Sequence, residues 1–217
     1  MSNLYRGIVF DMDGTLVDSE NLHIAAWLQM FQDNNIPISE HDIDDYIGVS
    51  DVLICEDIAN RFPTLKDART LLDEKRHYFR SSAQSMVKLI PGVNDGLERL
   101  RHIPKAVATM SSRYEADRSL VYTGIRQFFE GVVTADDVKI HKPDPECYLN
   151  ACKLINLEPN YCIGIEDSVS GISSSKRAGL FTIGVANTVS INRLGHADVV
   201  FNNTIEVMDY LTGVFKL

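Results

Sequence analysis

Residues 7–16 read GIVFDMDGTL, an apolar run followed directly by a pair of carboxylates. Gly7 to Phe10 predicts a short, fully buried strand, because its residues are apolar without alternation. Asp11 and Asp13 follow at the carboxyl end of that strand, where open α/β sheets bind their ligands. Gly14-Thr15 lets the backbone turn sharply and bring its N–H groups close to an anion. The stretch therefore predicts an α/β sheet with a site at Asp11 and Asp13; the alternative is two acids in a solvated loop.

Strand and helix patterns alternate from residue 91 onward. Alternation of this kind indicates a parallel, doubly wound sheet. The apolar runs predict strands at 105–109, 131–134, 162–165, 181–185 and 198–201. The helical patterns predict helices at 93–102, 114–122, 145–155 and 169–178, and a last helix that begins near Ile205. We therefore expect an α/β fold with a Rossmann-like core.

The stretch between the first strand and residue 85 carries only helical signals. Ser39 and Ser50 are suitable N-cap residues for two of its helices. Helices are expected at 20–34, from Ser39 to near residue 48, from Ser50 to about residue 62, and at 65–83. Because four consecutive helices cannot form one crossover between parallel strands, we expect an inserted domain without strands. The predicted boundaries are 1–15 and 86–217 for the α/β domain and 16–85 for the helical domain.

The charge and composition limit the class of partner. The chain has 217 residues, a formal net charge of −9 and no basic run, so nucleic acid is not expected as a partner. An anionic substrate must then be held locally, by a metal, a lysine or backbone N–H groups. No apolar stretch approaches the ~20 residues of a membrane-spanning helix, and no apolar segment typical of a signal peptide precedes the first strand. We expect a cytoplasmic monomer that has no contact with a membrane.

The cysteine spacing argues against a metal or redox motif. Cys55, Cys147, Cys152 and Cys162 include no C-x-x-C pair. We expect free thiols, as is usual in a reducing cytosol. Cys147 and Cys152 are expected to be buried in one helix as small apolar residues.

Polar side chains also follow two other predicted strands. Thr109-Met110-Ser111-Ser112 follows the strand at 105–108, Glu166-Asp167-Ser168 follows the strand at 162–165, and Lys142 lies on a nearby loop. Each feature has an ordinary alternative, a helix cap or a surface lysine. Together on one rim of the sheet they suit phosphoryl transfer. The two acid pairs offer hard oxygens to Mg²⁺, hydroxyl groups can hold phosphate oxygens, and a lysine can neutralise developing charge.

In order along the chain, these residues resemble the four motifs of the haloacid dehalogenase-like superfamily. The matching segments are Asp11-Met12-Asp13-Gly14-Thr15, Thr109, Lys142-Pro143 and Gly164-Ile165-Glu166-Asp167-Ser168. Further segments are similar to the β-phosphoglucomutase-like branch: Asp18-Ser19-Glu20, His23, Pro91-Gly92, Gly171 and Ala178-Gly179. The helical insertion resembles the cap domain of that branch.

The resemblance implies a role for each catalytic position. Asp11 would be the nucleophile and form an aspartyl-phosphate. Asp13 would be the general acid for the leaving oxygen and then the base for the attacking water. Dehalogenases of the superfamily lack this second acid, so Asp13 favours phosphate chemistry. Thr109, with help from Ser111, would bind the phosphoryl group, and Lys142 would steady the nucleophile and the phosphate.

The resemblance also implies a Mg²⁺ site. Its ligands would be Asp11, the backbone carbonyl of Asp13, and Asp167. Glu166 would be either a further ligand or a partner of the ligands, and both alternatives stay open. Hard-oxygen sites accept Mg²⁺ or Mn²⁺, so the preferred ion is open as well.

Two positions depart from the family pattern. The family usually has Gly before the motif lysine, where this chain has His141, which we expect to be a solvent-exposed loop residue. The β-phosphoglucomutases carry an arginine after a Gly-Val-Ser turn that grips the second phosphate of the substrate. Gly48-Val49-Ser50 matches the turn, but Asp51 follows it. Residues 16–90 contain 13 Asp+Glu and 7 Lys+Arg, a net charge of −6, which suits a monophosphate better than a bisphosphate.

Two groups of residues in the helical insertion are further candidates. His23 and Trp27 lie four apart, on one face of the first predicted helix, and are candidate substrate-binding residues. For Trp27 the alternative is packing within the helical domain. Lys75, Arg76 and His77 could reach the cleft from the last helix of the insertion, but we expect a solvated face there.

The sequence therefore predicts a Mg²⁺-dependent phosphatase of small phosphorylated metabolites, most plausibly sugar phosphates. The first alternative is a phosphomutase of the β-phosphoglucomutase type. The alternative from another class is a non-catalytic protein that binds phosphorylated metabolites; it would be expected to show a broken motif, whereas all four are intact.

Overall fold

A single parallel sheet forms the centre of the molecule. The computed structural model describes residues 4–43, 46, 49–62 and 66–216. The six strands of the sheet lie in the order β5-β4-β1-β6-β7-β8, and every neighbouring pair is parallel. Their bounds are β1 Gly7–Phe10, β4 Lys105–Ala108, β5 Gly131–Val133, β6 Cys162–Glu166, β7 Phe181–Val185 and β8 Val199–Phe201. This arrangement confirms the predicted doubly wound α/β fold.

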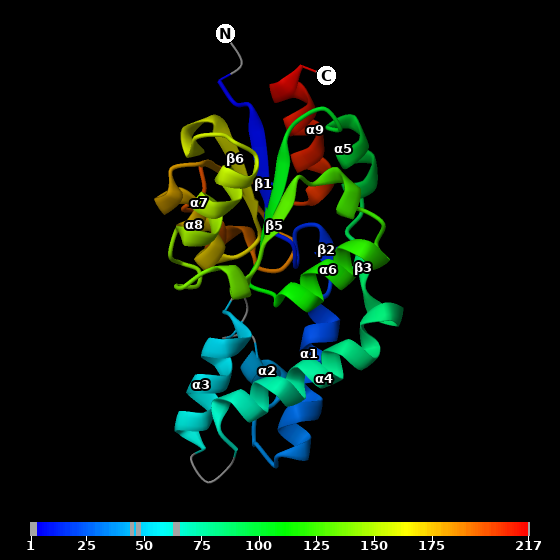
Figure 1. Ribbon diagram of the computed structural model, residues 1–217, viewed down its shortest axis with the longest axis vertical. Coiled ribbons are helices and arrows are strands. Elements are labelled where there is room, and N and C mark those ends of the chain that lie inside the picture. Colours follow the sequence, from blue (N-terminus) through cyan, green and yellow to red (C-terminus); the bar gives the residue numbers. More distant parts are fainter. Residues whose placement is uncertain (1–3, 44–45, 47–48, 63–65, 217) are drawn as a thin grey trace.

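Helices cover both faces of this sheet (Figure 1). One face packs on α5, α6 and α9, and the other on α7 and α8. Ile8 and Phe10 of β1 point into the first core, whereas Val9 points into the second, as the two-residue period of a strand requires. The helix bounds are α5 Val93–Arg99, α6 Arg113–Tyr122, α7 Glu146–Leu154, α8 Val169–Ala178 and α9 Thr204–Phe215.

Four further helices pack on one another below the sheet in Figure 1. They are α1 Glu20–Asp33, α2 Glu40–Ile43, α3 Asp51–Arg61 and α4 Ala68–Met86. Their apolar side chains, such as Trp27, Phe31 and Ile58, form a cluster separate from the two cores that flank the sheet. We call residues 16–85 the helical segment. The expected end of its second helix near residue 48 and the expected start of its last helix at residue 65 lie outside the described residues.

The expectation that the helical segment has no strand was wrong. Val17–Asp18 (β2) pairs antiparallel with Lys88–Leu89 (β3), with Val17 opposite Leu89 and Asp18 opposite Lys88. A strand of two residues is too short to show any periodicity in the sequence. The pair ties together the two points where the chain enters and leaves the helical segment.

Most other element bounds agree with prediction within one or two residues, but two helices differ by three. One is α4, which ends at Met86 instead of about residue 83, and the other is α5. It ends at Arg99 instead of residue 102, because the chain continues in tight turns in which Arg101 N donates to Glu98 O and Ile103 N to Leu100 O. In the fully described connections, short 3₁₀ helices occur at Arg126–Phe128, Ala135–Asp137, Pro159–Tyr161 and Ile191–Leu194.

Two expectations from composition also find their counterpart in the structure. All four cysteines are free and buried, and Cys147 and Cys152 share α7. Within the described ranges, no helix is both long and apolar enough to cross a bilayer.

Candidate active site

Asp11 lies at the centre of the site because β1 lies at the centre of the sheet. Its backbone N–H donates to Ile165 O of β6 (2.9 Å), and its side chain emerges at the carboxyl end of β1, only 7% exposed. The neighbouring strands end at the same rim, where β4 delivers Thr109 and β6 delivers Asp167. The parallel order of the strands therefore brings three distant stretches of sequence together.

Lys142 reaches Asp11 from the loop that precedes α7. Its Nζ donates to Asp11 Oδ1 (2.7 Å), to Glu166 Oε1 (2.6 Å) and to the carbonyl of Ala108 (2.9 Å). Burial alone would lower the pKa of Lys142, but the charges of Asp11 and Glu166 raise it, so this lysine stays protonated. Burial and the charge of Glu166 raise the pKa of Asp11. The lysine thus holds the proposed nucleophile in place and partly neutralises it.

Glu166 has hydrogen-bond partners on both carboxylate oxygens. Oε1 accepts from Lys142 and from the hydroxyl of Tyr148 (3.1 Å). Oε2 accepts from the backbone N–H groups of Asp167 and Ser168 and from the Ser168 hydroxyl. The side chain is fully buried and does not line the cavity described below. Its contacts suit the fixing of Lys142 more than direct contact with a substrate.

Three carboxylates form a cluster that suits a divalent cation. Asp11, Glu166 and Asp167 each present an oxygen, and these oxygens lie within 4.8 Å of one another. Burial and the charge of Glu166 raise the pKa of Asp167 to about 8. Buried, mutually repelling carboxylates of this kind offer the hard oxygen donors that Mg²⁺ prefers. The residues present therefore fit the predicted metal site.

The side chain of Asp13 turns away from this cluster toward a group of hydroxyls. Its Oδ2 accepts from Ser111 Oγ (2.7 Å) and Thr109 Oγ1 (3.1 Å), and its Oδ1 accepts from Ser19 Oγ (2.5 Å). His23 Nε2 lies 3.6 Å from Oδ1. Burial alone would raise the pKa of Asp13, but the interaction with His23 and the hydrogen bonds from Ser19 and Ser111 lower it strongly. Asp13 is therefore held as a carboxylate, in contact with both hydroxyls that the sequence predicts for phosphate binding.

Gly14 is required where the turn passes close to the carboxylate cluster. Its φ of +77° lies in the left-handed region, and a Cβ there would overlap the Asp167 carboxylate and the Thr188 hydroxyl. Asn187 Nδ2 also donates to the carbonyl of Gly14 (2.8 Å). The motif glycine thus lets the backbone pass close to the carboxylate of Asp167 in the acidic cluster.

Sequence reasoning missed several residues of this site. Thr188 Oγ1 donates to Asp167 Oδ2, and Thr188 lines the cavity. Thr188 and Asn187 follow β7, so inspecting the carboxyl end of that strand would have found them. Tyr148, on α7, stacks under the ammonium of Lys142 with Nζ 5.0 Å from the ring centre, and no local sequence signal marks it.

A cavity of about 160 Å³ lies between the rim of the sheet and the helical segment. The α/β part contributes the polar groups already described, and the helical segment contributes a mainly apolar wall. Trp27 meets both expectations, since it lines the cavity and also stacks on Phe31 inside the helical cluster (5.5 Å between ring centres). Residues of the helical segment that line the cavity are Ser19, His23, Ile24, Trp27, Ile43, Tyr46, Val49, Asp51 and Ile54.

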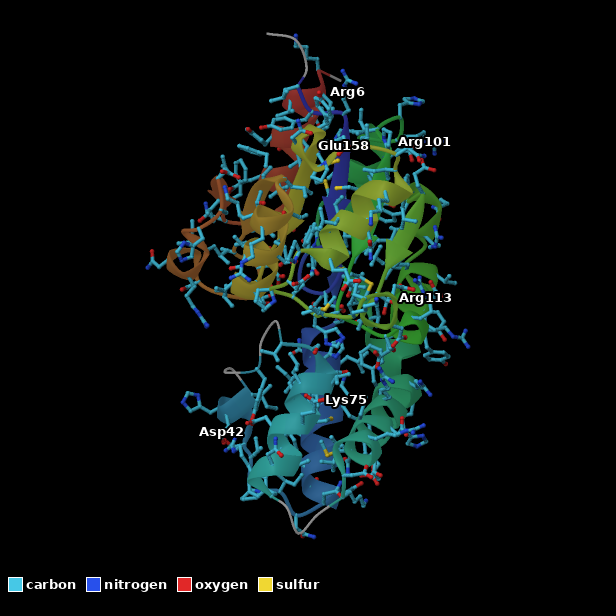
Figure 2. All side chains as sticks on the ribbon, turned by 60° about the vertical axis from the view of Figure 1, so that its left-hand side comes forward. Arg6, Asp42, Lys75, Arg101, Arg113 and Glu158 are labelled. Atoms are coloured by element: carbon cyan, nitrogen blue, oxygen red, sulfur yellow. The ribbon has the colours of Figure 1, made fainter. Side chains whose placement is uncertain are left out.

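The expectation of a solvated face at Lys75 was wrong. Lys75 is fully buried and lies among the helices of the helical segment (Figure 2). Its Nζ donates to Asp51 Oδ2 (2.5 Å) and to His23 Nδ1 (2.8 Å), and it lies over the rings of Trp27 and Phe79. Because an ammonium can only donate, Nδ1 of His23 must accept, which leaves the proton of the neutral ring on Nε2, facing Asp13.

The two residues that follow Lys75 differ from it. Arg76 is partly buried, and its Nη2 lies 3.9 Å from Oδ1 of Asp136 in the α/β part. His77 is exposed, as expected. Lys75 was not predictable as a buried residue because its partners Asp51 and His23 come from two other helices.

His141 was also expected on the solvent-exposed face of a loop, and this was wrong. It is half-buried, and its Nδ1 lies 2.7 Å from Oγ of Ser50, the N-cap residue of α3. The bond joins the loop of Lys142 to the helical segment across 91 positions of sequence, a distance over which sequence patterns carry no contact information.

Comparison with known proteins gives a consistent result. A sequence model of the haloacid dehalogenase-like hydrolases matches residues 8–185. Validoxylamine A 7'-phosphate phosphatase from Streptomyces hygroscopicus subsp. limoneus is 31% identical over 206 residues, 94% of this chain and 96% of that protein. Fructose-1-phosphate phosphatase YqaB from Escherichia coli (strain K12) is 31% identical over 188 residues, 85% of this chain and 98% of that protein. The crystal structure of β-phosphoglucomutase from Clostridium difficile aligns with a TM-score of 0.85 at 25% identity, covering 98% of this chain and 97% of that one.

Proposed function

The chain belongs to the haloacid dehalogenase-like hydrolases, and we propose that it is a Mg²⁺-dependent phosphatase of small phosphorylated metabolites, with sugar phosphates as the substrate class. One observation carries this proposal. The Lys142 ammonium bonds both Asp11 and Glu166, beside an acidic cluster and beside Asp13 with its hydroxyl partners. Two relatives that are 31% identical are phosphatases of a fructose phosphate and of a validoxylamine phosphate, which supports the substrate class.

In the proposed first step, an Asp11 oxygen attacks phosphorus and the bond from phosphorus to the leaving oxygen breaks. Lys142 holds Asp11 in place and offsets its repulsion of the phosphate. Asp13 takes up a proton from solvent as the phosphate binds and gives this proton to the leaving oxygen. The pKa of Asp13 is low in the free protein, and the arriving phosphate raises it by like-charge repulsion. The phosphoryl group displaces Asp13 from the hydroxyls of Thr109 and Ser111, which then bind its oxygens.

In the second step, a water molecule attacks phosphorus while Asp13, now a carboxylate, takes the water's proton. The bond between Asp11 and phosphorus then breaks, which releases inorganic phosphate and restores the carboxylate of Asp11. The proton stays on Asp13 until the phosphate departs, and Asp13 then releases it to solvent. The two steps together consume one water per phosphate released. Asp13 is suited to both steps because its hydroxyl partners and His23 stabilise its charged form when the phosphate has left.

The metal would be held by the carboxylates of Asp11 and Asp167 and by the backbone carbonyl of Asp13. A bound Mg²⁺ supplies positive charge that neutralises the phosphate oxygens. Glu166 acts as a positioning residue for Lys142, because both of its oxygens accept hydrogen bonds from protein groups. Thr188 orients Asp167 through its hydrogen bond to Oδ2.

We also propose that residues 16–85 act as a cap over the α/β domain of residues 1–15 and 86–217. The cavity between the two parts is lined by residues of both, including Asp11 on one side and Trp27 on the other. Closure of the cap would exclude bulk water from the phosphoryl group. The side chains of the helical segment would therefore contact the part of the substrate that is remote from the phosphate.

A phosphomutase acting on a hexose phosphate is the second candidate. The similarity to a β-phosphoglucomutase structure over almost the whole chain favours it. Such an enzyme must bind a bisphosphate intermediate, and this chain has Asp51 at the position of the expected arginine.

The test is release of inorganic phosphate from a panel of sugar phosphates, polyol phosphates and nucleotides, with Mg²⁺ and again with excess EDTA. We expect release from a few sugar phosphates, none in EDTA, and recovery when Mg²⁺ is added back. No release from any member would reject the phosphatase. Conversion of a hexose 1-phosphate into its 6-phosphate, in the presence of a bisphosphate primer, would then establish the mutase.

A further inference from the structure

Among the described residues of the helical segment, the one carboxylate that lines the cavity is that of Asp51. This residue begins α3, directly after the N-cap Ser50, and its side chain is 15% exposed. The wall around it is formed mainly by Ile24, Trp27, Ile43, Val49 and Ile54, which we call the distal wall. Among the described residues of the helical segment that line the cavity, none is a lysine or an arginine. The remote end of the cavity therefore offers a hydrogen-bond acceptor in apolar surroundings.

The charge of Asp51 is compensated from outside the cavity. Lys75 donates to Asp51 Oδ2 from a fully buried position and does not line the cavity. Its ammonium also donates to His23, so it is committed to protein partners. A negatively charged group at the distal wall would meet the carboxylate of Asp51 and, in the part of this wall that the structure describes, no lysine or arginine. A hydroxyl or ammonium group there would find an acceptor held in a fixed position.

From this arrangement we propose that Asp51 determines specificity at the remote end of the substrate. It accepts a hydrogen bond from a hydroxyl or protonated amine of the substrate's body and excludes a second phosphate. The substrate would then be a monophosphate whose body bears hydroxyl or amino groups and whose apolar face packs on Trp27. The inference rests on the proposed function, since it assumes that the monophosphate end lies at Asp11.

The test measures a ratio, kcat/KM for a monophosphate divided by kcat/KM for the bisphosphate with the same reacting phosphate. Fructose 1-phosphate with fructose 1,6-bisphosphate is one such pair, and the pair is chosen to include the best substrate of the panel. We expect the natural protein to favour the monophosphate by at least about tenfold, a modest difference for one like-charge contact. Since both values come from one protein sample, the ratio does not depend on the fraction of molecules that are folded.

Two substitutions should move this ratio in opposite directions. Asp51→Asn keeps the shape of the side chain but removes its charge, so the ratio should fall about tenfold. Lys75→Met removes the compensating charge and leaves Asp51, so the ratio should rise. If Asp51→Asn does not fold because the buried ammonium of Lys75 loses its hydrogen-bonded carboxylate, the double variant Asp51→Asn/Lys75→Met removes both charges of the pair and should lower the ratio. Glu56→Gln is the matched control, an exposed acid of the same helix outside the cavity, and should leave the ratio unchanged.

An unchanged ratio in Asp51→Asn or its double variant, with phosphate still released from the monophosphate, would overturn this inference and leave the phosphatase in place. A ratio that rises in these variants would overturn it as well. Absence of phosphate release from every monophosphate would reject the proposed function and this inference together.

Discussion

The most consequential single residue beside the nucleophile is Asp13. Three hydroxyls and His23 surround its carboxylate and lower its pKa, so the free protein holds it in the ionised form. The same hydroxyls, from Thr109 and Ser111, are the groups predicted to bind the phosphoryl group. Proton transfer and phosphate binding are thus coupled at one carboxylate.

Replacement of Asp13 should separate the two chemical steps. In Asp13→Asn we expect release of phosphate from a sugar phosphate to fall by about 10²–10⁴-fold, because the leaving oxygen and the attacking water both lose their proton partner. The fold should be kept, since the amide is isosteric with the carboxylate. With p-nitrophenyl phosphate, whose leaving group needs no proton, rapid mixing should show a burst of nitrophenol followed by slow turnover. An equal loss for both substrates and no burst would contradict the role of Asp13.

At the residue scale, the sequence predicted well the placement of those site residues that belong to local motifs. The spacing of Asp11, Asp13, Lys142 and Asp167 relative to the strands placed them on one rim, and they do lie around one cavity. Lys75 and His141 were misjudged because their environment comes from distant elements. The ammonium of Lys75 lies over the rings of Trp27 and Phe79, and the partner of His141 is Ser50.

At the scale of elements, helix α8 is held against β6 by a contact that tolerates no side chain. A Cβ on Gly171 would overlap the carboxylate of Glu166, which has no room to move because its oxygens hold Lys142, Tyr148 and Ser168. The close approach of this helix therefore keeps Glu166, and through it Lys142, in position. A substitution far from the substrate should disturb the chemistry by this route.

We expect Gly171→Ala to lower the free energy of unfolding by about 1–3 kcal/mol through overpacking and to lower kcat as well. Gly213→Ala in α9 is the matched control, since a Cβ there meets nothing within 4 Å. In this control the free energy of unfolding should rise by up to about 1 kcal/mol, because alanine is the better helix former, and kcat should stay unchanged. Denaturant unfolding and steady-state rates measure both effects. If Gly171→Ala kept both the free energy of unfolding and kcat, as Gly213→Ala should, the contact between Gly171 and Glu166 would not be what positions Lys142.

The elements themselves were largely predictable, with exceptions that have a physical reason. Buried parallel strands are uninterrupted apolar runs, so β1, β6 and β7 can be read directly from the sequence. The pair β2 and β3 was missed because two residues show no period and their pairing joins positions 17–18 to 88–89. The early end of α5 was missed because the chain after Arg99 continues in tight turns. Arg101 N and Ile103 N there donate to carbonyls three residues earlier, not four as in an α-helix.

At the scale of the whole molecule, the acidic cluster links metal binding to folding. In the metal-free protein, burial raises the pKa of Asp167 to about 8, whereas an unfolded chain releases this proton near ~3.9. Between these pH values the folded state binds the extra proton, so its stability falls as pH rises through this window. A divalent cation replaces the proton and should remove this loss.

The prediction is that Mg²⁺ raises the melting temperature more strongly as pH increases from about 5 to about 8. Thermal unfolding with Mg²⁺ and with EDTA, at matched ionic strength, measures the difference. Asp167→Asn is the control variant and should show a small shift with weak pH dependence, because it lacks both the ligand and the titrating group. A Mg²⁺ effect that is the same at every pH would contradict the proposed site.

The sequence predicted the doubly wound sheet and the inserted helices because alternation and helical period are local properties repeated along the chain. It did not predict how the helical segment sits over the rim. That arrangement depends on single contacts between distant residues, such as Ser50 with His141 and Arg76 with Asp136. The composition of the distal wall follows from the same placement. The sequence, through Asp51 and the net charge of the insertion, indicated a preference for a monophosphate but not which residues surround Asp51.

The central claim is that Asp11 carries the phosphoryl group during turnover. The direct measurement is an acid quench of the protein during turnover of the best panel substrate with Mg²⁺, followed by mass spectrometry of its peptides. We predict a phosphoryl adduct on the peptide that contains Asp11, and in Asp11→Asn neither the adduct nor phosphate release above roughly one ten-thousandth of the natural rate. Phosphate release by Asp11→Asn at the natural rate, or an adduct on another residue, would contradict the account.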